Sequence, residues 1–460
     1  MEETKRIVTR FAPSPTGKAH AGSYRTAMYA WLFARNQGGK FILRIEDTDT
    51  ARNSKEAQDD IYEALSWLGI DNDEQYIQSE HLVRHQELLN KLITEDKAYI
   101  SREEAKDGSG VMKDIIRFRN PNTLVTFVDL IRGPISIDTT DLGDFVIART
   151  INEPLYHLAV VIDDHDERVT HVIRAEEHIA NTPRHILLLE AFEWDIPAYA
   201  HLPLVLGQDK QKLSKRRNAL PMTDYAKVGY LPEAVFNCIA MIGWNPADPG
   251  SDQELFTTEE LIKRFDFARM QKGGAVFNIE KLNWFNREYI KKLSMQEFWK
   301  HAHVWLPVWI ENIPSTQEML KKIEHLFRDH IEKFSDIATL LSADDVSDRG
   351  AAEFDYFFME PIVDEKILVW KTLKDDPDGL EKTKTYLKQV AALLAPLTEE
   401  TWNYDGIKNV LIEYADQEGK GNVLWPLRVA LSGKEKSPDP FEMASILGKD
   451  ATIRRVLVYI

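Results

Sequence analysis

The 460-residue sequence contains one cysteine, Cys238, so it can form neither an internal disulfide bond nor a cysteine-rich zinc site. It has no run near the roughly 18 consecutive apolar residues that a membrane-spanning helix requires. Its first residues, MEETKR, lack the apolar segment of a signal peptide. Basic residues are also in deficit, because 57 Lys and Arg face 74 Asp and Glu, a formal net charge of −17. We therefore expect a cytoplasmic protein, outside membranes, that does not coat nucleic acid non-specifically, although a local basic groove is compatible with this charge.

The first third of the chain predicts strands that alternate with helices. Hydrophobic residues make up 43% of the sequence, enough for sizeable cores. Residues 6–11 and 40–45 are β-prone runs, and residues 22–36 have helical spacing. Ser54 is expected to cap a further helix that ends before Gly69. This order predicts a parallel sheet with helices on its faces.

Later segments extend this pattern and then change it. Residues 156–162 and 169–173 are predicted strands, and the polar turn between them contains the acidic group DDHD at 163–166, which we interpret as a solvated tip rather than a metal site. Residues 182–192 are predicted as a helix and 202–206 as a strand. Most of the chain from residue 232 onward has the pattern of amphipathic helices, so the sequence predicts an α/β half followed by a helical half.

The segment PSPTGKAHAGS, residues 13–23, lies between the first predicted strand and helix. Ligands bind beyond the carboxyl ends of strands in open parallel sheets, and the N–H groups at a helix N-terminus favour phosphate. Gly17 and Gly22 permit close backbone approach, and His20 can donate a hydrogen bond to a phosphate oxygen. Taken alone, an ordinary Pro/Gly turn explains the segment equally well.

A second segment, DKQKLSKRR at residues 209–217, concentrates positive charge in an acidic protein. Five of the eight positions from Lys210 to Arg217 are basic. Such a loop can clamp a triphosphate as charge develops on it. Taken alone, it is better explained as a solvated basic loop or a non-specific nucleic-acid patch.

Together the two segments resemble the HIGH and KMSKS signatures of class I aminoacyl-tRNA synthetases, in the family's order and about 190 residues apart. Further segments are similar to glutamyl-tRNA synthetases of the bacterial type. They are VTRFAPSPTG (8–17), GKFILRIEDTD (39–49), VIRAEEH (172–178), NTPR (181–184), residues 277–290, PLRVALSG (426–433) and LGK (447–449). The resemblance covers nearly the whole chain.

The resemblance implies a fold class: an α/β, Rossmann-like class I synthetase catalytic domain with an inserted acceptor-binding domain, followed by an all-α anticodon-binding half. The expected divisions are 1–95 and 181–230 for the two halves of the catalytic domain, 96–180 for the acceptor-end-binding segment and the return to the sheet, 231–314 for a helical stem-contact junction and 315–460 for the anticodon-binding domain. The helical pattern beyond residue 277 disfavours a glutaminyl-tRNA synthetase, whose C-terminal half is β-rich. It also disfavours a relative that glutamylates a modified tRNA base, because such proteins resemble only the catalytic half.

The resemblance also implies a reaction and its partners. L-glutamate would be activated by ATP, with Mg²⁺ accompanying the nucleotide, to glutamyl-adenylate, and then transferred to tRNA(Glu), with tRNA(Gln) left open as a second acceptor. A monomer is expected. The catalytic residues carried over are His20, Gly22, Lys212 and Lys215. The ATP-binding residues carried over are Pro13, Gly17, His20, Gly22, Lys212, Leu213, Ser214 and Lys215, and the glutamate-binding residues are Arg10, Ala12, Ser14, Glu46, Tyr156 and Arg174.

These residue types suit the expected ligands. Guanidinium groups match carboxylates, so Arg10 and Arg174 are assigned to the carboxylate groups of glutamate and Glu46 to its ammonium group. Without the resemblance, both arginines are better explained as structural ion-pair partners of Asp47, Asp49 or Glu176. Local basic and aromatic candidates for tRNA contact are Lys272, Lys281, Trp284, Arg287, Lys291, Lys292, Lys420 and Arg428.

Three positions depart from the family pattern. Val160 stands where some members carry Asn, so that residue's role is not transferred. Ile100, Ser101 and Arg102 follow Ala98-Tyr99, where zinc-binding members have a Cys-x-Cys pair, so no zinc is expected and no metal is assigned to the protein itself. Arg217-Asn218 replaces a frequent His-Gly pair. A catalytically silent tRNA-binding paralogue is the non-enzymatic alternative, which the presence of His20 and the basic loop disfavours.

Overall fold

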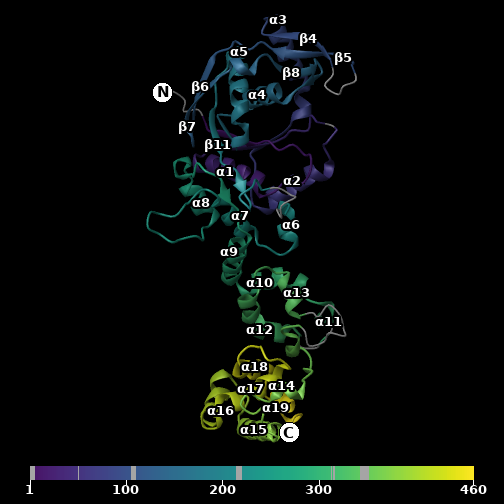
Figure 1. Ribbon diagram of the computed structural model, residues 1–460, viewed down its shortest axis with the longest axis vertical. Coiled ribbons are helices and arrows are strands. Elements are labelled where there is room, and N and C mark those ends of the chain that lie inside the picture. Colours follow the sequence, from purple (N-terminus) through teal and green to yellow (C-terminus); the bar gives the residue numbers. More distant parts are fainter. Residues whose placement is uncertain are drawn as a thin grey trace. The chain divides into compact units, whose positions relative to one another are not determined.

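The computed structural model describes residues 6–49, 51–104, 110–213, 220–311, 313, 316–341 and 352–460 (Figure 1). The chain divides into two compact units, Met1–Tyr289 and Ile290–Ile460. Each unit is described by itself. In the described residues, no helix is both long enough and apolar enough to cross a membrane.

The first unit is built on a seven-stranded sheet of order β3-β2-β1-β10-β11-β6-β7. Its strands are mostly parallel, and only β7 runs antiparallel to its neighbour, so the predicted parallel sheet is confirmed. The strands are β1 (Val8–Phe11), β2 (Lys40–Ile45), β3 (Glu74–Ile77), β6 (Leu124–Asp129), β7 (Gly133–Asp138), β10 (His171–Ala175) and β11 (Ala198–Leu202).

Helices cover both faces of this sheet, as strand β1 illustrates. Val8 belongs to the apolar core formed with α3 (Leu82–Thr94), α4 (Tyr156–Asp166) and α5 (Thr182–Phe192). Thr9 points the other way, because its Oγ1 donates a 2.8 Å hydrogen bond to the carbonyl of Ala30 in α1 (Ala21–Asn36). Successive side chains of a strand alternate between faces, so α1 and the α3–α4–α5 layer lie on opposite sides of the sheet.

Local signals place several elements as predicted. Helix α2 (Lys55–Trp67) begins after Ser54, whose Oγ accepts a 3.1 Å hydrogen bond from the Ala57 amide. The predicted helix at 182–192 is α5, and its N-terminus contains Pro183. The single strand predicted at 202–206 is instead divided between β11 and β12 (Val205–Leu206), with Pro203 between them. Proline has no amide hydrogen for the ladder, which accounts for the break.

One prediction was wrong: residues 156–162 form the start of helix α4, not a strand. Leu158 to Ile162 is a continuous apolar run, and all of it is buried between the sheet and neighbouring helices. A short, fully buried run has no polar face, so its periodicity cannot distinguish a strand from a helix. The acidic residues that follow are therefore in the last turn of a helix, and Asp163 and Asp164 are buried rather than at a solvated tip.

A smaller antiparallel sheet, of order β4-β5-β8-β9, is inserted in the chain between β3 and β10. Its strands are β4 (Ala98–Glu104), β5 (Met112–Phe118), β8 (Phe145–Thr150) and β9 (Glu153–Pro154). After β11 the first unit continues with α6 (Met222–Lys227), α7 (Pro232–Ala240), α8 (Thr258–Arg264) and β13 (Ala275–Val276), which pairs with β12. Helix α9 (Ile279–Lys292) begins in the first unit and ends in the second.

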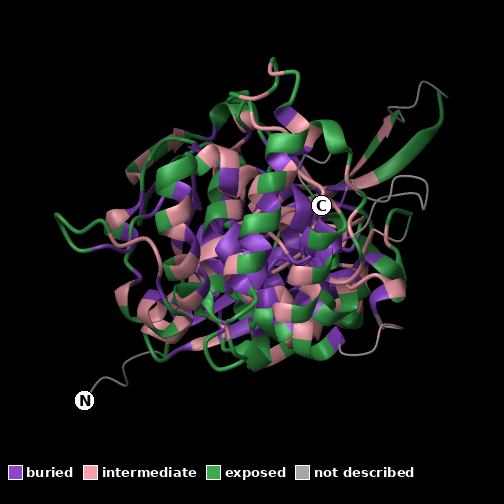
Figure 2. Cartoon of the chain, turned by 90° about the horizontal axis from the view of Figure 1, so that it is seen from below, coloured by how far each residue is buried: buried purple, intermediate pink, exposed green. Residues whose placement is uncertain are grey.

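The second unit is helical throughout its described residues, which contain no β-strand, so the predicted helical half is confirmed. Many apolar residues of these helices are buried, and buried residues are coloured purple in Figure 2. Trp402 fixes one of the contacts, because its indole Nε1 donates a 2.9 Å hydrogen bond to the carbonyl of Ala444. The helices are α10 (Met295–Ala302), α11 (Val308–Glu311), α12 (Thr316–His330), α13 (Asp336–Leu341), α14 (Glu365–Leu368), α15 (Gly379–Leu394), α16 (Tyr404–Glu418), α17 (Lys420–Ser432), α18 (Pro440–Leu447) and α19 (Lys449–Leu457).

Candidate active site

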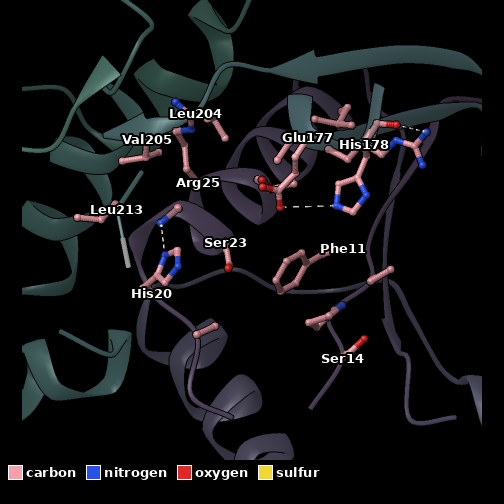
Figure 3. Close-up of a pocket in the computed structure, with 18 of the residues that line it drawn as sticks. Phe11, Ser14, His20, Ser23, Arg25, Glu177, His178, Leu204, Val205 and Leu213 are labelled. Carbon is pink, nitrogen blue, oxygen red and sulfur yellow. Dashed lines mark hydrogen bonds and ion pairs between the residues drawn. The ribbon is translucent and has the colours of Figure 1, made fainter. Parts of the chain in front are cut away.

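A cavity of about 500 Å³ lies at the carboxyl ends of β1, β2 and β10, in the first unit (Figure 3). This is the edge at which open parallel sheets bind ligands. The cavity brings together most of the site residues expected from the sequence, although they come from distant parts of the chain. Those that line it are Arg10, Ala12, Pro13, Ser14, Gly17, His20, Gly22, Glu46, Tyr156, Arg174, Lys212 and Leu213. Ser214 and Lys215 lie outside the described residues.

His20 forms the N-cap of α1. Its Nδ1 accepts a 3.1 Å hydrogen bond from the amide of Gly22, which in the neutral ring leaves the hydrogen on Nε2. A Cβ at position 22 would lie 3.0 Å from Cε1 and 3.1 Å from Nδ1 of His20, so the ring would have to shift by a few tenths of an ångström to accept it. Gly17 has φ = 136°, a conformation that side-chain-bearing residues rarely adopt. The first turn of α1 carries no acidic side chain, so the dipole of this 16-residue helix meets an anion without local repulsion.

The basic segment is anchored at the other side of the same cavity. The Leu213 amide donates a 2.9 Å hydrogen bond to the carbonyl of Val205, and Lys212 forms a β-bridge with Leu206. The Lys212 ammonium pairs with the carboxylate of Glu177, another residue of the cavity wall. Figure 3 shows His20 near Leu213 and Val205, with Glu177 and His178 across the cavity.

The chain also returns to this place after the basic segment. Pro221 forms an antiparallel bridge with His20, and the Met222 amide donates a 3.2 Å hydrogen bond to the carbonyl of Ala19. Lys212 and Leu213 of the basic segment and Pro221 and Met222 after it are therefore held near the α1 N-terminus. Two sequence regions about 190 residues apart thus share one cavity.

Arg10 belongs to a buried ionic network. Its Nε and Nη2 donate to Oδ1 and Oδ2 of Asp164 at 3.0 and 3.3 Å. Arg44, which is fully buried, donates to Asp164 at 2.9 Å, to Glu167 at 2.7 Å and to Glu46 at 3.4 Å. Thus Arg44 ties Glu46 to the carboxylate that holds Arg10, and the two expected ligand-binding groups share one support.

Burial and the neighbouring charges shift the pKa values of the acidic residues in this network in different directions. Burial raises the pKa of Glu46, and Arg44 and Arg10 oppose that rise. Burial, with the charges of Asp164 and Asp163, raises the pKa of Glu167 to about 8 in spite of Arg44. The pKa of Asp164 stays below its ordinary value although burial raises it, because Arg10 and Arg44 both pair with it. Glu46 lines the cavity and meets Arg44 only at 3.4 Å, so its carboxylate can also meet a cationic ligand group.

Arg174 is held differently from Arg10. Its guanidinium donates to His201 Nε2 at 3.2 Å, His185 Nδ1 at 3.2 Å and Thr182 Oγ1 at 2.8 Å, and reaches the carbonyl of His178 at 3.4 Å. Burial lowers its pKa below the ordinary arginine value. Tyr156, from the first turn of α4, lines the cavity nearby and is 37% exposed.

The structural partners suggested for the two arginines from sequence were wrong. Asp47 accepts from the amide and hydroxyl of Ser79, at 2.8 and 2.7 Å. Asp49 pairs with Arg52, and Glu176 pairs with Arg132. The partner of Arg10 is Asp164, which sequence reasoning had placed in a solvated turn.

Sequence reasoning therefore missed Asp164, Arg44 and Glu167 as supports of the site, and also the histidines around Arg174. A signal was present, since Asp163, Asp164 and Glu167 recur at the spacing of one helix face next to a buried apolar run. This spacing becomes informative only when the apolar run before it, residues 158–162, is assigned to a helix. In the described residues, no group of three or more His, Cys, Asp or Glu side chains is arranged to hold a metal ion.

The candidate tRNA-contacting residues differ in how far their side chains are engaged. Lys281 pairs with Glu254 at 2.6 Å, and Lys420 pairs with Asp416 at 3.1 Å. Arg428 is directed inward, because its Nη1 donates to the carbonyls of Ser437 and Pro438. Trp284 is 38% exposed on α9. The exposed cations remain candidates, whereas Arg428 has a structural role in closing the turn before α18.

Comparisons with known proteins agree with this architecture. The family model for the catalytic domain of class I tRNA synthetases (E and Q) matches residues 6–107 and 100–284, and that for an anticodon binding domain matches residues 297–460. The chain is 38% identical to the glutamate–tRNA ligase of Clostridium novyi, over 99% of this chain and 97% of that protein. It is 37% identical to the glutamate–tRNA ligase of Clostridium acetobutylicum, over 98% of both.

Solved structures give the same result over the whole chain. A glutamate tRNA ligase from Elizabethkingia meningosepticum, crystallised with its amino acid, superimposes with a TM-score of 0.85 at 31% identity, covering 99% of both chains. The glutamate-tRNA synthetase of Elizabethkingia anophelis superimposes with a TM-score of 0.82 at 30% identity, also covering 99% of both chains. This chain therefore belongs to the class I tRNA synthetases of the E and Q group, in the glutamate–tRNA ligase family.

Proposed function

We propose that this protein ligates glutamate to tRNA(Glu), using ATP. The observation that supports this most is the single cavity that His20 and Gly22 share with Lys212, next to Arg10, Glu46 and Arg174. The groups that we assign to phosphate and those that we assign to the amino acid line the same cavity, as the joining of a nucleotide to an amino acid requires. Membership of the glutamate–tRNA ligase family supports the choice of substrates.

The residues present fit a nucleoside triphosphate. The α1 N-terminus offers free amide groups, and the glycine positions 17 and 22 leave space beside them that a Cβ would fill or strain. We assign His20 to a phosphate oxygen and Lys212 and Lys215 to the pyrophosphate as it leaves. Pro13, Leu213 and Ser214 complete the assigned ATP contacts. Mg²⁺ would enter with the ATP phosphates and offset their charge.

The remaining groups fit glutamate. Arg10 and Arg174 are assigned to its carboxylate groups and Glu46 to its ammonium group, while Ala12, Ser14 and Tyr156 line the amino-acid end. In the first step, a carboxylate oxygen of glutamate attacks the α-phosphorus of ATP, and the bond to pyrophosphate breaks. In the second, the terminal 2′-hydroxyl of tRNA attacks the activated carbonyl, and AMP leaves. Neither step needs a protein nucleophile, so the chain acts by positioning groups and by neutralising charge.

We further propose the rest of the arrangement expected from the sequence. Residues 1–95 and 181–230 would form the catalytic domain, 96–180 the acceptor-end-binding segment, 231–314 the stem-contact junction and 315–460 the anticodon-binding domain. The anticodon-domain match over residues 297–460 supports a tRNA partner. A monomer working in the cytoplasm, where charged tRNA is used, completes this proposal, and tRNA(Gln) remains the second acceptor to be tested.

Charging of purified tRNA(Glu) and tRNA(Gln) with glutamate, measured in parallel, tests the proposal. ATP–pyrophosphate exchange is measured with and without tRNA. Charging of tRNA(Glu) supports the assignment, and exchange seen only with glutamine contradicts it. Charging of tRNA(Gln) as well would show that the protein has tRNA(Gln) as a second acceptor.

Lysine variants test the assigned roles. Lys212→Ala and Lys215→Ala should each slow charging by roughly 10²-fold or more, because each removes a charge that acts on the leaving group, while tRNA affinity stays nearly unchanged. Lys91→Ala is the matched control, since Lys91 lies on α3 and pairs only with Glu95 at 3.8 Å among the contacts described. If both active-site variants charge tRNA as fast as the control, the leaving-group roles are wrong.

A further inference from the structure

The guanidinium of Arg174 is surrounded by uncharged acceptors. These are two imidazole nitrogens, the hydroxyl of Thr182 and a main-chain carbonyl. Among the described residues, no carboxylate pairs with it. The one carboxylate in this cluster, Asp129, is separated from the guanidinium by the ring of His201. Arg10 contrasts with this, because it meets Asp164 through two hydrogen bonds.

Counting N–H groups shows what each arginine has left for a ligand. A guanidinium has five. Arg174 directs its Nε–H to His201, one Nη1–H to His185 and its Nη2 group to Thr182 and the carbonyl of His178, which leaves one Nη1–H. Arg10 gives two to Asp164 and keeps three. Arg10 therefore retains more donors but a compensated charge, whereas Arg174 retains one donor and a charge with no direct counterion.

The hydrogen bonds from Arg174 fix the tautomers of His185 and His201, because an arginine side chain can only donate hydrogen bonds and each ring nitrogen must therefore accept. His201 Nε2 and His185 Nδ1 must be without hydrogen. The hydrogen of His201 is then on Nδ1, which lies 2.7 Å from Asp129, and that of His185 is on Nε2, which lies 3.1 Å from Nδ1 of His157. Asp129 is itself fixed by the amides of residues 131 and 132, at 3.0 and 2.9 Å.

The environment keeps these rings uncharged at neutral pH. Burial is the main cause that lowers the pKa of His185 and of His201, and the positive charge of Arg174 lowers both further. Burial, with the charges of Arg184 and Arg174, lowers the pKa of His157 to about 4. The two histidines therefore hold Arg174 without adding charge of their own.

We propose that His185, His201 and Thr182 are positioning residues that fix the orientation of Arg174 and leave its positive charge for the side-chain carboxylate of the amino-acid substrate. Selection of glutamate over glutamine then depends on this clamp. This inference rests on the proposed function, since it concerns the same amino-acid pocket. A carboxylate gains a charge-assisted hydrogen bond from such a guanidinium, whereas an amide gains an ordinary one, and the clamp keeps the donor in line.

The test compares three folded variants by steady-state charging with glutamate and with glutamine. His185→Leu removes the acceptor while filling a similar volume. His185→Asn restores an acceptor close to the position of Nδ1. His171→Leu is the control, because His171 lies at the amino end of β10, the strand that carries Arg174, and contacts Phe33 instead of the guanidinium. Thr182→Val is the alternative variant if His185→Leu does not fold. It keeps the shape and removes the hydroxyl that accepts from Arg174 and that also lies 3.3 Å from the His178 carbonyl and 3.0 Å from Nε2 of His201.

We expect His185→Leu to raise KM for glutamate by about 10-fold or more with a smaller change in kcat, the usual size of effect when a charged group loses a hydrogen bond. The ratio of kcat/KM for glutamate to that for glutamine should fall with it. His185→Asn should restore most of the wild-type KM for glutamate and most of the glutamate-to-glutamine ratio of kcat/KM. His171→Leu should match the wild type in both quantities. An unchanged ratio in His185→Leu, or no recovery in His185→Asn, would overturn the inference. Failure of the wild type to charge tRNA(Glu) with glutamate would instead refute the proposed function.

Discussion

Replacing Arg44 with methionine should destabilise the first unit selectively. Methionine keeps the length of the aliphatic stem but removes a fully buried guanidinium that contacts Asp164, Glu167 and Glu46 at 2.9, 2.7 and 3.4 Å. Removing one partner of a buried ion pair costs about 3–5 kcal/mol, because the other charge stays buried without compensation.

Two features of the network put the expected loss near the lower limit, at about 3 kcal/mol. Asp164 keeps its contact with Arg10 at 3.0 Å. Glu167, whose pKa burial already raises to about 8, can hold a proton at neutral pH in place of the lost partner. A unit that ends at Tyr289 has an unfolding entropy of about 600 cal/mol/K at about 2.1 cal/mol/K per residue. The Tm of its transition should therefore fall by about 5 °C.

Differential scanning calorimetry of the full chain measures this, with the transition of the helical unit as an internal reference. Arg52→Met is the matched control, because Arg52 is exposed and pairs only locally, with Asp49; its shift should stay within about 1 °C. KM for glutamate should rise in Arg44→Met, since Arg10 and Glu46 lose their common support. A Tm equal to that of the control would refute the view that Arg44 balances the buried carboxylates.

Three further predictions concern single groups. The pKa of the Glu167 carboxyl is ordinarily near 4.5 but is raised to about 8 in the folded protein, so between these values the folded protein holds a proton that the unfolded chain releases. The contribution of Glu167 to stability should therefore fall as pH rises from about 5 to 8, and the Tm of the wild type relative to that of Glu167→Gln should fall over that range, whereas parallel curves would contradict this. Gly22→Ala should slow charging by about 10²-fold with little change in Tm, because the new Cβ would lie 3.0 Å from Cε1 of His20; undiminished charging would show that the ring position is not critical. Burial raises the pKa of Cys238 to about 12, so its thiol should resist a thiol reagent such as DTNB until urea unfolds the protein, and fast reaction in the native state would contradict the buried position.

Much of the fold could be predicted from local signals. Strand β2 begins and ends as its apolar run indicates, Ser54 caps α2, and α5 spans the predicted residues. These elements carry their own boundaries, in the form of a capping hydroxyl, a proline or a glycine stop. Helix α4 carries no such boundary at its start: Leu155 is its N-cap and makes no side-chain hydrogen bond to it. Its apolar run therefore fitted a strand until neighbouring elements were known.

The sequence by itself determined which chemical groups this protein has and in what order: a glycine-rich turn with His20, a basic segment with Lys212, and arginines suited to carboxylates. Tertiary structure alone decided which groups meet. Asp164 meets Arg10 across 154 positions of the chain because helix α4 packs against the sheet that contains β1. Arg174 meets His201 across 27 positions because β10 and β11 pair in parallel with these two residues in register. The charge state of each ionisable group depends on these tertiary contacts, because burial and the nearest partner set its pKa. Neither the burial nor the partner can be read from the neighbouring residues along the chain.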